Sequence, residues 1–274
     1  MTILDRIIEQ KRVEVSTRQA AVSARELERR PDFGRQPLSA RASLLAPGST
    51  GIIAEFKRKS PSKGVINDRA AVAATTQGYV RAGAACLSVL TDEPFFGGTP
   101  ADLHDARVAN PHTPILRKDF VIDTYQLLEA KAWGADLVLL IAACLSPDEV
   151  RSLSRFAHEL GLEVLLEVHD EAELDRSLCD TVDLVGVNNR NLKTFVTSID
   201  TSLRLIERIP APFGRITESG LHDAATMVRL REAGYDGFLI GEAFMKTDAP
   251  AEAMATLVAE YNQTFNLFKT HHTL

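Results

Sequence analysis

Four stretches of this 274-residue chain share one pattern: RAGAACLSVL (81–90), KAWGADLVLLI (131–141), HELGLEVLLEV (158–168) and REAGYDGFLIG (231–241). In each stretch a helical segment ends at a glycine, and an apolar run begins shortly afterwards. Glycine adopts the left-handed conformation that ends many helices at little cost. A strand that is buried on both faces is apolar along its whole length. The pattern therefore indicates a repeated unit in which a helix is followed by a buried parallel strand.

Apolar runs of this kind occur at eight places along the chain: 51–57, 85–91, 114–119, 136–141, 163–168, 184–189, 214–218 and 236–241. Helical patterns separate them, among them 68–82, 124–133, 146–160, 171–178, 198–209 and 223–233. The sequence Ser146-Pro147-Asp148-Glu149 has the residue types that begin a helix. Eight such units in a chain near the roughly 250 residues typical of this fold predict a closed (β/α)8 TIM barrel. We assign the barrel to residues 51–265.

Residues 1–50 precede the barrel and are expected to form a helical extension that caps it. Ile3, Leu4, Ile7 and Ile8 lie at helical spacing, which predicts an amphipathic helix. This helix could only cap the barrel, or it could also help to close the active site. The last residues, 266–274, are expected to be a frayed tail. No second domain and no linker are expected.

Charge and composition exclude several classes of protein. The net charge of −6 argues against a nucleic-acid or anionic-membrane binder. The longest apolar run, 137–145, is far shorter than the roughly 20 residues of a membrane span, and the charged N-terminus does not resemble a secretory signal. Cys86, Cys144 and Cys179 have no paired spacing, so buried free thiols in a reducing cytoplasm are expected. We expect a soluble monomer or weak homo-oligomer.

Charged and polar residues gather at the predicted C-terminal ends of the strands, where barrel enzymes place their active sites. Residues two apart in a strand share a face, so Glu55 lies on the same side as Lys57, and Asn188 on the same side as Arg190. The rim that these faces predict carries Glu55, Lys57, Lys118, Glu167, Asn188, Arg190 and Glu218. Buried charges of both signs are costly unless they pair or take part in chemistry. A structural ion-pair network is possible, but seven converging polar groups favour a site.

The ends of the last two strands predict a phosphate site. Ser219-Gly220 follows the seventh strand and Gly241-Glu242 the eighth, which is the usual phosphate position in barrels. Ser60, in the loop after the first strand, can add a hydroxyl group. Strand alternation predicts that Glu242 points outward, toward the helices, where its carboxylate would find a cationic or backbone donor. The sequence thus predicts a small phosphorylated substrate.

Aromatic residues follow two strands near the lysines. Phe95 and Phe96 lie after the second strand, and Phe120 after the third. Aromatic rings in such loops often only pack or form lids. Beside charged groups they could also form a slot for a flat apolar group.

Seven segments resemble the indole-3-glycerol-phosphate synthase family, and they occur in the order found in that family. They are IIAEFKRKSPSKG (52–64), SVLTDEPFFGG (88–98), ILRKDFVIDTYQ (115–126), LLEVHDEAEL (165–174), GVNNRNL (186–192), ITESGL (216–221) and FLIGEAFM (238–245). The first and third are specific to this family rather than to barrels in general. The N-terminal segment also resembles the extra leading helix of the family.

The resemblance implies a reaction on 1-(o-carboxyphenylamino)-1-deoxyribulose 5-phosphate. A ring carbon attacks the ketone, carbon dioxide leaves, and water is eliminated to give the indole. It implies that Lys118 is the general acid at the ketone oxygen, and that Lys57 and Glu167 carry out the dehydration. Glu55 would orient Lys57, while Asn188 and Glu218 would hold the substrate hydroxyls and the lysines. Such steps need positioned acids and bases whatever the family.

The resemblance also implies where the substrate binds. The phosphate would bind Ser60, Arg190, Ser219, Gly220, Gly241 and Glu242, in the last four through the main chain. The aromatic ring would lie near Pro61, Phe96, Phe120 and Leu139. No metal and no organic cofactor are implied, since no step transfers electrons.

Three alternative functions stay open at this point. A phosphoribosylanthranilate isomerase would be expected to have a cysteine after the first strand and an aspartate near the sixth, where this chain has Glu55 and Asn188. A Schiff-base aldolase would use Lys118 as a nucleophile. A catalytically inactive binding barrel would not need both rim lysines.

Overall fold

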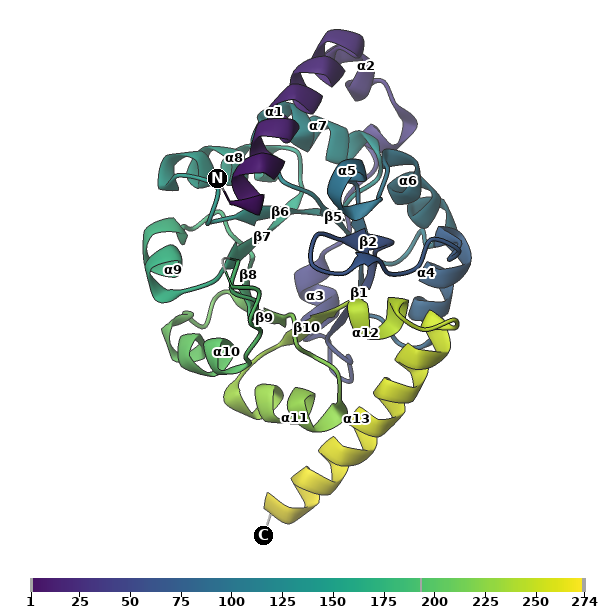
Figure 1. The fold of residues 1–274 in the computed structure, drawn as a ribbon, viewed down its shortest axis with the longest axis vertical. Helices are drawn as coiled ribbons and strands as arrows, with labels where there is room; N and C mark the ends of the chain where they lie inside the picture. The colour runs from purple at the N-terminus through teal and green to yellow at the C-terminus, as the bar shows by residue number, and fades with distance from the viewer. Residues whose placement is uncertain (1, 193, 273–274) are drawn as a thin grey trace.

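The structure is a computed structural model of the chain, and it describes residues 2–192 and 194–272. Eight parallel strands close into a barrel in the order β1-β10-β9-β8-β7-β6-β5-β4 (Figure 1). The strands are β1 (Ile52–Phe56), β4 (Cys86–Leu90), β5 (Ile115–Lys118), β6 (Leu137–Ile141), β7 (Glu163–Val168), β8 (Leu184–Asn188), β9 (Gly214–Glu218) and β10 (Gly237–Ile240). Each begins and ends within about one residue of its predicted range. The predicted closed barrel is confirmed.

Helices connect the strands on the outside of the barrel. They are α4 (Val72–Arg81), α6 (Pro100–Ala109), α7 (Thr124–Ala132), α8 (Pro147–Glu159), α9 (Glu171–Ser177), α10 (Asp200–Leu205) with the 3-10 turn η2 (Ile206–Arg208), α11 (Ala224–Ala233) and α13 (Pro250–His272). The helix expected over 68–82 begins only at Val72, and the one expected over 198–209 is divided between α10 and η2. Ser146 caps α8 as predicted, since its side chain accepts a hydrogen bond from the N–H of Glu149.

Three short elements in the loops after strands were not predicted as separate elements. They are α5 (Glu93–Phe96), α12 (Glu242–Met245) and an antiparallel hairpin of β2 (Lys59–Ser60) and β3 (Gly64–Val65). All three follow the C-terminal ends of strands, so they lie on the face that carries barrel active sites.

The glycines that end the four quoted helical segments have positive φ angles, as their pattern predicts. The values are +100° at Gly83, +88° at Gly134, +76° at Gly161 and +112° at Gly234. Residues other than glycine rarely adopt this backbone conformation. These positions therefore set where each helix stops and the chain turns back into the sheet.

Alternation along the strands divides the core into two parts. Ile52, Ala54 and Phe56 of β1 belong to the outer core between sheet and helices. Ile53 belongs to the core inside the barrel, together with Leu116, Leu139, Leu165, Ile216 and Leu239. The inward parity of β1 continues to Glu55 and Lys57, so their side chains emerge at the barrel mouth.

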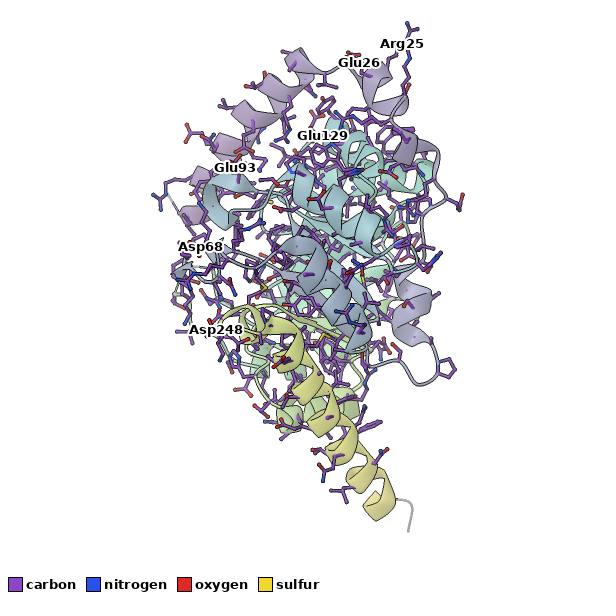
Figure 2. The ribbon with its side chains drawn as sticks, turned by 90° about the vertical axis from the view of Figure 1, so that its right-hand side faces the viewer. Arg25, Glu26, Asp68, Glu93, Glu129 and Asp248 are labelled. Atoms are coloured by element: carbon purple, nitrogen blue, oxygen red, sulfur yellow. The ribbon has the colours of Figure 1, made fainter. Side chains whose placement is uncertain are left out.

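The N-terminal residues form α1 (Ile3–Ala21), α2 (Ala24–Glu28), the 3-10 turn η1 (Pro31–Gly34) and α3 (Ala40–Leu45). Ala40 and Leu44 of α3 pack into the inner core, and the hydroxyl of Ser43 donates to the carbonyl of Ala85 at 2.6 Å. Since Ala85 precedes β4, α3 lies at the N-terminal end of the barrel. In the side view, Asp68, Glu93 and Asp248, which follow β3, β4 and β10, lie along one side of the molecule (Figure 2).

The C-terminal segment and the thiols differ in part from expectation. Residues 266–272, expected to be a frayed tail, continue α13 as far as His272, and residues 273–274 lie outside the described part of the chain. All three cysteines are free as expected, but only Cys86 is buried, while Cys144 and Cys179 are half-buried. Among the described residues, no helix is long and apolar enough to cross a membrane.

Candidate active site

A cavity opens at the C-terminal ends of the barrel strands. Its lining includes every residue that the sequence predicted for the site: Glu55, Lys57, Ser60, Pro61, Phe96, Lys118, Phe120, Leu139, Glu167, Asn188, Arg190, Glu218, Ser219, Gly220, Gly241 and Glu242. Strand parity explains most of this convergence, because Glu55, Lys118, Glu167 and Glu218 lie on the inward faces of their own strands.

Glu55 and Lys57 form an ion pair on the wall made by β1. The Nζ atom of Lys57 lies 2.5 Å from Oε1 of Glu55. Burial alone would raise the pKa of Glu55, but the ammonium groups of Lys57 and Lys118 outweigh it and lower that pKa. A Cβ atom on Gly241 would lie 2.6 Å from Oε1 of Glu55. Glycine at position 241 therefore leaves the space that this carboxylate occupies.

Lys118 lies across the cavity, between two glutamates. Its Nζ atom is 2.7 Å from Oε2 of Glu218 and 3.3 Å from Oε2 of Glu167. Burial alone would lower the pKa of Lys118, but the carboxylates of Glu218, Glu167 and Glu55 outweigh it and raise that pKa above its usual value. The Lys118 side chain is therefore positively charged.

Glu167 and Glu218 have opposite pKa shifts. Burial and the neighbouring Glu167 raise the pKa of Glu218. Burial would also raise the pKa of Glu167, but Lys118 and His169 outweigh it and lower that pKa. Asn188 adds a hydrogen bond from Nδ2 to Oε1 of Glu167 at 3.3 Å. Two carboxyl groups with separated pKa values can divide the roles of base and acid between them.

The loop after β9 has an unusual backbone. Ser219 has a φ of +69°, one of two positive values among the described non-glycine residues, and Gly220 follows with +78°. Such a conformation costs about 1–3 kcal/mol outside glycine and often occurs at functional sites. Asn189 helps to hold it, since its Nδ2 donates to the carbonyl of Ser219 at 3.1 Å. A Cβ atom on Gly220 would lie 2.8 Å from a methyl group of Thr197, so this turn also needs a glycine.

Glu242 corrects one expectation. Its carboxylate does not point outward toward the helices but lies at the cavity, 3.4 Å from a guanidinium nitrogen of Arg190 and 3.5 Å from Nζ of Lys63. Strand alternation fails here because β10 ends at Ile240 and Glu242 is the first residue of α12. The expected cationic partner is present. Arg190 also donates to the hydroxyl of Ser62 at 2.8 Å, which joins the loops after β1 and β8.

An apolar wall faces the charged groups. The ring centroids of Phe96 and Phe120 lie 5.9 Å apart with planes tilted by 40°. Pro61 and Leu139 line the same cavity, whereas Phe95 is not among the lining residues. Asp92 places Phe96, because its carboxylate caps α5 and accepts hydrogen bonds from the N–H groups of Phe95 and Phe96.

Several lining residues were not predicted as part of the site. Ile3, Leu4 and Ile7 of α1 reach the cavity, so the N-terminal helix forms part of its wall as well as packing on the barrel. The apolar stripe was visible in the sequence, but its position over the mouth was not. Leu192 and Phe195 from the loop after β8 also line the cavity, and the latter has a φ of +58°.

Lys11 joins α1 to the catalytic face through buried ion pairs. Its side chain is fully buried, and Nζ lies 2.8 Å from Asp92, 3.0 Å from Asp119 and 2.8 Å from Glu14. Asp119 directly follows Lys118 in the chain, and Asp92 caps the helix that carries Phe96. The sequence gives no sign of this role, because a lysine in a charged amphipathic helix is normally exposed.

Metal ligation has no support among the residues that the structure describes, since no group of three or more His, Cys, Asp and Glu side chains there could hold an ion.

The chain is similar to known proteins over most of its length. Residues 4–257 match the family model described as indole-3-glycerol phosphate synthase. The chain is 48% identical over 257 residues to the indole-3-glycerol phosphate synthase of Bacteroides thetaiotaomicron, and the match covers 92% of this chain and 96% of that protein. The protein of the same name from Salinibacter ruber is 47% identical over 261 residues, covering 95% of this chain and 96% of its own.

Solved structures share the fold at low sequence identity. A 3-hexulose-6-phosphate synthase from Salmonella typhimurium matches with a TM-score of 0.61 at 16% identity, covering 78% of this chain and 99% of that one. A mutant tryptophan synthase alpha-subunit from Pyrococcus furiosus matches with a TM-score of 0.58 at 16% identity, covering 78% and 98%. These two likenesses concern the barrel alone.

Proposed function

Since the chain belongs to the indole-3-glycerol phosphate synthase family, we propose how its side chains divide the work of that reaction. The enzyme is a decarboxylating lyase of tryptophan biosynthesis. It converts 1-(o-carboxyphenylamino)-1-deoxyribulose 5-phosphate into indole-3-glycerol phosphate. The observation that carries the assignment of roles is Lys118, a protonated amine between two glutamates of opposite pKa shift.

Ring closure needs a proton at the ketone oxygen as the ring carbon attacks it. Lys118 supplies this proton, because its raised pKa keeps it charged and its Nζ lies at the cavity wall. The positive charge also stabilises the alkoxide that develops before the proton arrives. Loss of carbon dioxide then restores the aromatic ring.

Dehydration needs a base for a carbon-bound proton and an acid for the departing hydroxide. Glu167 is the base, because its lowered pKa keeps it ionised. Lys57 is the acid, and Glu55 holds its ammonium group in place at 2.5 Å. Asn188 orients Glu167, and Glu218 holds Lys118 and the substrate hydroxyls.

The two ends of the cavity suit the two ends of the substrate. The phosphate binds the main chain of Ser219, Gly220, Gly241 and Glu242, with Arg190 and Ser60 at the rim. The Glu242 carboxylate is already engaged by Arg190 and Lys63, which reduces its repulsion of the phosphate. The aromatic ring lies against Pro61, Phe96, Phe120 and Leu139.

Lys118 is poorly suited to the alternative role of a Schiff-base nucleophile. A nucleophilic lysine must lose its proton, whereas the carboxylates around Lys118 raise its pKa.

Free thiols in the described chain support our placement of the enzyme in a reducing cytoplasm.

The test is an ultraviolet assay for the indole product with purified protein and the carboxyphenylamino substrate. We expect turnover of the order of 1–10³ s⁻¹, the usual range for enzymes. A protein that binds the substrate without forming indole would contradict these assignments. Borohydride trapping of a covalent adduct at Lys118 would support the aldolase alternative instead.

A further inference from the structure

His169 lies directly behind the proposed base. It directly follows β7 and is two residues beyond Glu167 in the chain. Its Nε2 atom is 3.3 Å from Oε1 of Glu167, and its Nδ1 atom is 3.1 Å from Oε2 of Glu173. The imidazole is only 10% exposed, and it is not among the residues that line the cavity. It therefore contacts the catalytic machinery without reaching the substrate.

The orientation of the ring is held by the first turn of α9. The carboxylate of Glu173 accepts hydrogen bonds from the backbone N–H of His169 at 2.8 Å and pairs with Nδ1. Since a carboxylate can only accept, Nδ1 carries a proton, and Nε2 is left to face Glu167. Among the described residues, Nε2 has no aligned hydrogen-bond partner, although it is buried. A buried imidazole nitrogen at ion-pair distance from a catalytic carboxylate calls for an explanation.

The charges around His169 favour its protonated form. Glu167 of β7, Glu173 of α9 and Glu218 of β9 face it, and Lys118 of β5 lies beyond Glu167. Burial alone would lower the pKa of His169, but the hydrogen bond to Glu173 and the negative charges of the three glutamates outweigh it and raise that pKa. The surroundings of His169 therefore favour its imidazolium form.

The reaction consumes one proton in each turnover. The carboxylate group of the substrate leaves as neutral carbon dioxide. The products together therefore carry one negative charge fewer than the substrate. In the proposed steps Lys118 and Lys57 each give a proton, while Glu167 takes only one from carbon. Lys118 can be charged again before the dehydration, while the substrate occupies the mouth, only if a group already inside the site supplies a proton.

We propose that His169 lends a proton to Lys118 through Glu167 within each turnover and takes a proton back from Glu167 when the product leaves. This inference rests on the proposed function of the site. After Lys118 has protonated the ketone oxygen, the Nε2–H bond of His169 breaks and an O–H bond forms on Glu167. The carboxyl group turns and gives this proton to the neutral amine of Lys118, so that Glu167 is again ionised for the dehydration step.

The protons balance over the whole cycle. At the end Lys118 is charged again, Glu167 holds the proton from carbon, and His169 and Lys57 each lack one. When the product leaves, Glu167 returns its proton to Nε2 of His169, and water in the open cavity reprotonates Lys57. The net uptake is one proton from solvent. His169 acts through Glu167, so it is a positioning and proton-storing residue rather than one that touches the substrate.

The test is the pH dependence of kcat for the wild type, His169→Gln and Glu173→Gln. Wild-type kcat should fall as the pH rises through the pKa of His169. Glutamine can hydrogen-bond near Glu167 but cannot carry a proton, so His169→Gln should lose this limb. Its kcat should fall about tenfold near neutral pH with KM within about twofold, a modest share of the effect of general acid–base catalysis. Glu173→Gln removes a negative charge, lowers the pKa of His169 and should move the limb to lower pH.

A matched control is His158→Gln. His158 also pairs with a carboxylate, with Nε2 2.9 Å from Oδ2 of Asp183, but it lies on α8, away from the lining of the cavity. The pH profile of kcat for His158→Gln should equal that of the wild type. Wild-type kcat and an unmoved limb in both His169→Gln and Glu173→Gln would overturn the proposal while leaving the proposed function intact. If His169→Gln fails to fold, the position of the falling limb in the pH profile of Glu173→Gln tests the proposal by itself. A wild-type protein that forms no indole would instead reject the function.

Discussion

Lys118 illustrates how single residues of this site combine stability with chemistry. Burying an ammonium group costs several kcal/mol unless opposite charges compensate it, and here Glu167 and Glu218 lie within 3.3 Å and 2.7 Å. The same carboxylates raise its pKa. The arrangement that makes the buried charge tolerable therefore also keeps Lys118 protonated, as its proposed acid role requires.

Replacement of Lys118 by alanine should abolish turnover. We expect kcat to fall by at least about 10²-fold to 10⁴-fold, because both the proton and the charge that stabilises the alkoxide are lost. Fold and phosphate binding should remain nearly intact, since the raised pKa of Glu218 lets it take up a proton when its partner is removed. Steady-state kinetics, circular dichroism and phosphate titration check this. A variant with wild-type kcat would move the acid role to Lys57.

Phe96 and Phe120 should contact the aromatic ring of the substrate. Alanine at either position should weaken binding of a substrate analogue that carries the ring, but should spare inorganic phosphate, whose proposed site lies at the other end of the cavity. Phe95→Ala is a matched control, because Phe95 is adjacent but does not line the cavity. Titration calorimetry with both ligands measures the effect. Equal losses for both ligands would indicate collapse of the whole site.

At the scale of elements, α1 is attached to the barrel through Lys11. This side chain contacts Asp92 before α5 and Asp119 after β5, and so joins the N-terminal helix to the elements that carry Phe96 and Lys118. The position of α1 over the mouth is thus coupled to the geometry of the aromatic wall.

Lys11→Met should destabilise the protein by about 3–5 kcal/mol, because it leaves the buried Asp92 without a cation and removes one of the two cations beside Asp119. KM should rise, since Ile3, Leu4 and Ile7 of α1 would no longer be held against the cavity. Arg12→Met on the exposed face of the same helix is the control and should change neither quantity. Urea unfolding and steady-state kinetics measure both. Unchanged stability in Lys11→Met would show that the buried pairs do not hold the helix.

At the scale of the whole molecule, α13 covers the outside of the barrel between α4 and α11 (Figure 1). Its buried side chains include Met254, Leu257 and Tyr261. Tyr261 lies against Phe238 of β10 and accepts a hydrogen bond from Arg231 at 3.1 Å. The helix thereby closes the side of the molecule where the last strand meets the first.

Removal of residues 268–274 should leave the melting temperature within about 2 °C of the wild type, because the buried contacts named above all precede that segment. Tyr261→Ala should instead cost about 3 kcal/mol or more, as large-to-small changes in a core do. Calorimetry of both variants checks this. A large loss on truncation would show that the end of α13 contributes to stability and is not a frayed tail.

The sequence by itself determined the barrel and most of the proposed site. Each strand is a local apolar run preceded by a helix and a glycine, and strand alternation is a local rule. It therefore predicted that Glu55, Lys57, Lys118, Glu167, Asn188 and Glu218 face one cavity, as the structure places them. Alternation failed at Glu242 because the strand had already given way to a helix, and a change of element cannot be read from parity.

Only the tertiary structure decided which distant charges meet. The burial of Lys11 depends on where α1 rests on the barrel, and its partners Asp92 and Asp119 lie far from it in the sequence. The orientation of His169 depends likewise on the direction in which the chain turns from β7 into α9. The periodicity of a sequence shows which side of its own helix or strand a residue faces. Which residue it meets on another element depends on how whole elements pack together. The energy of that packing is shared among many side chains and does not depend on any single stretch of sequence.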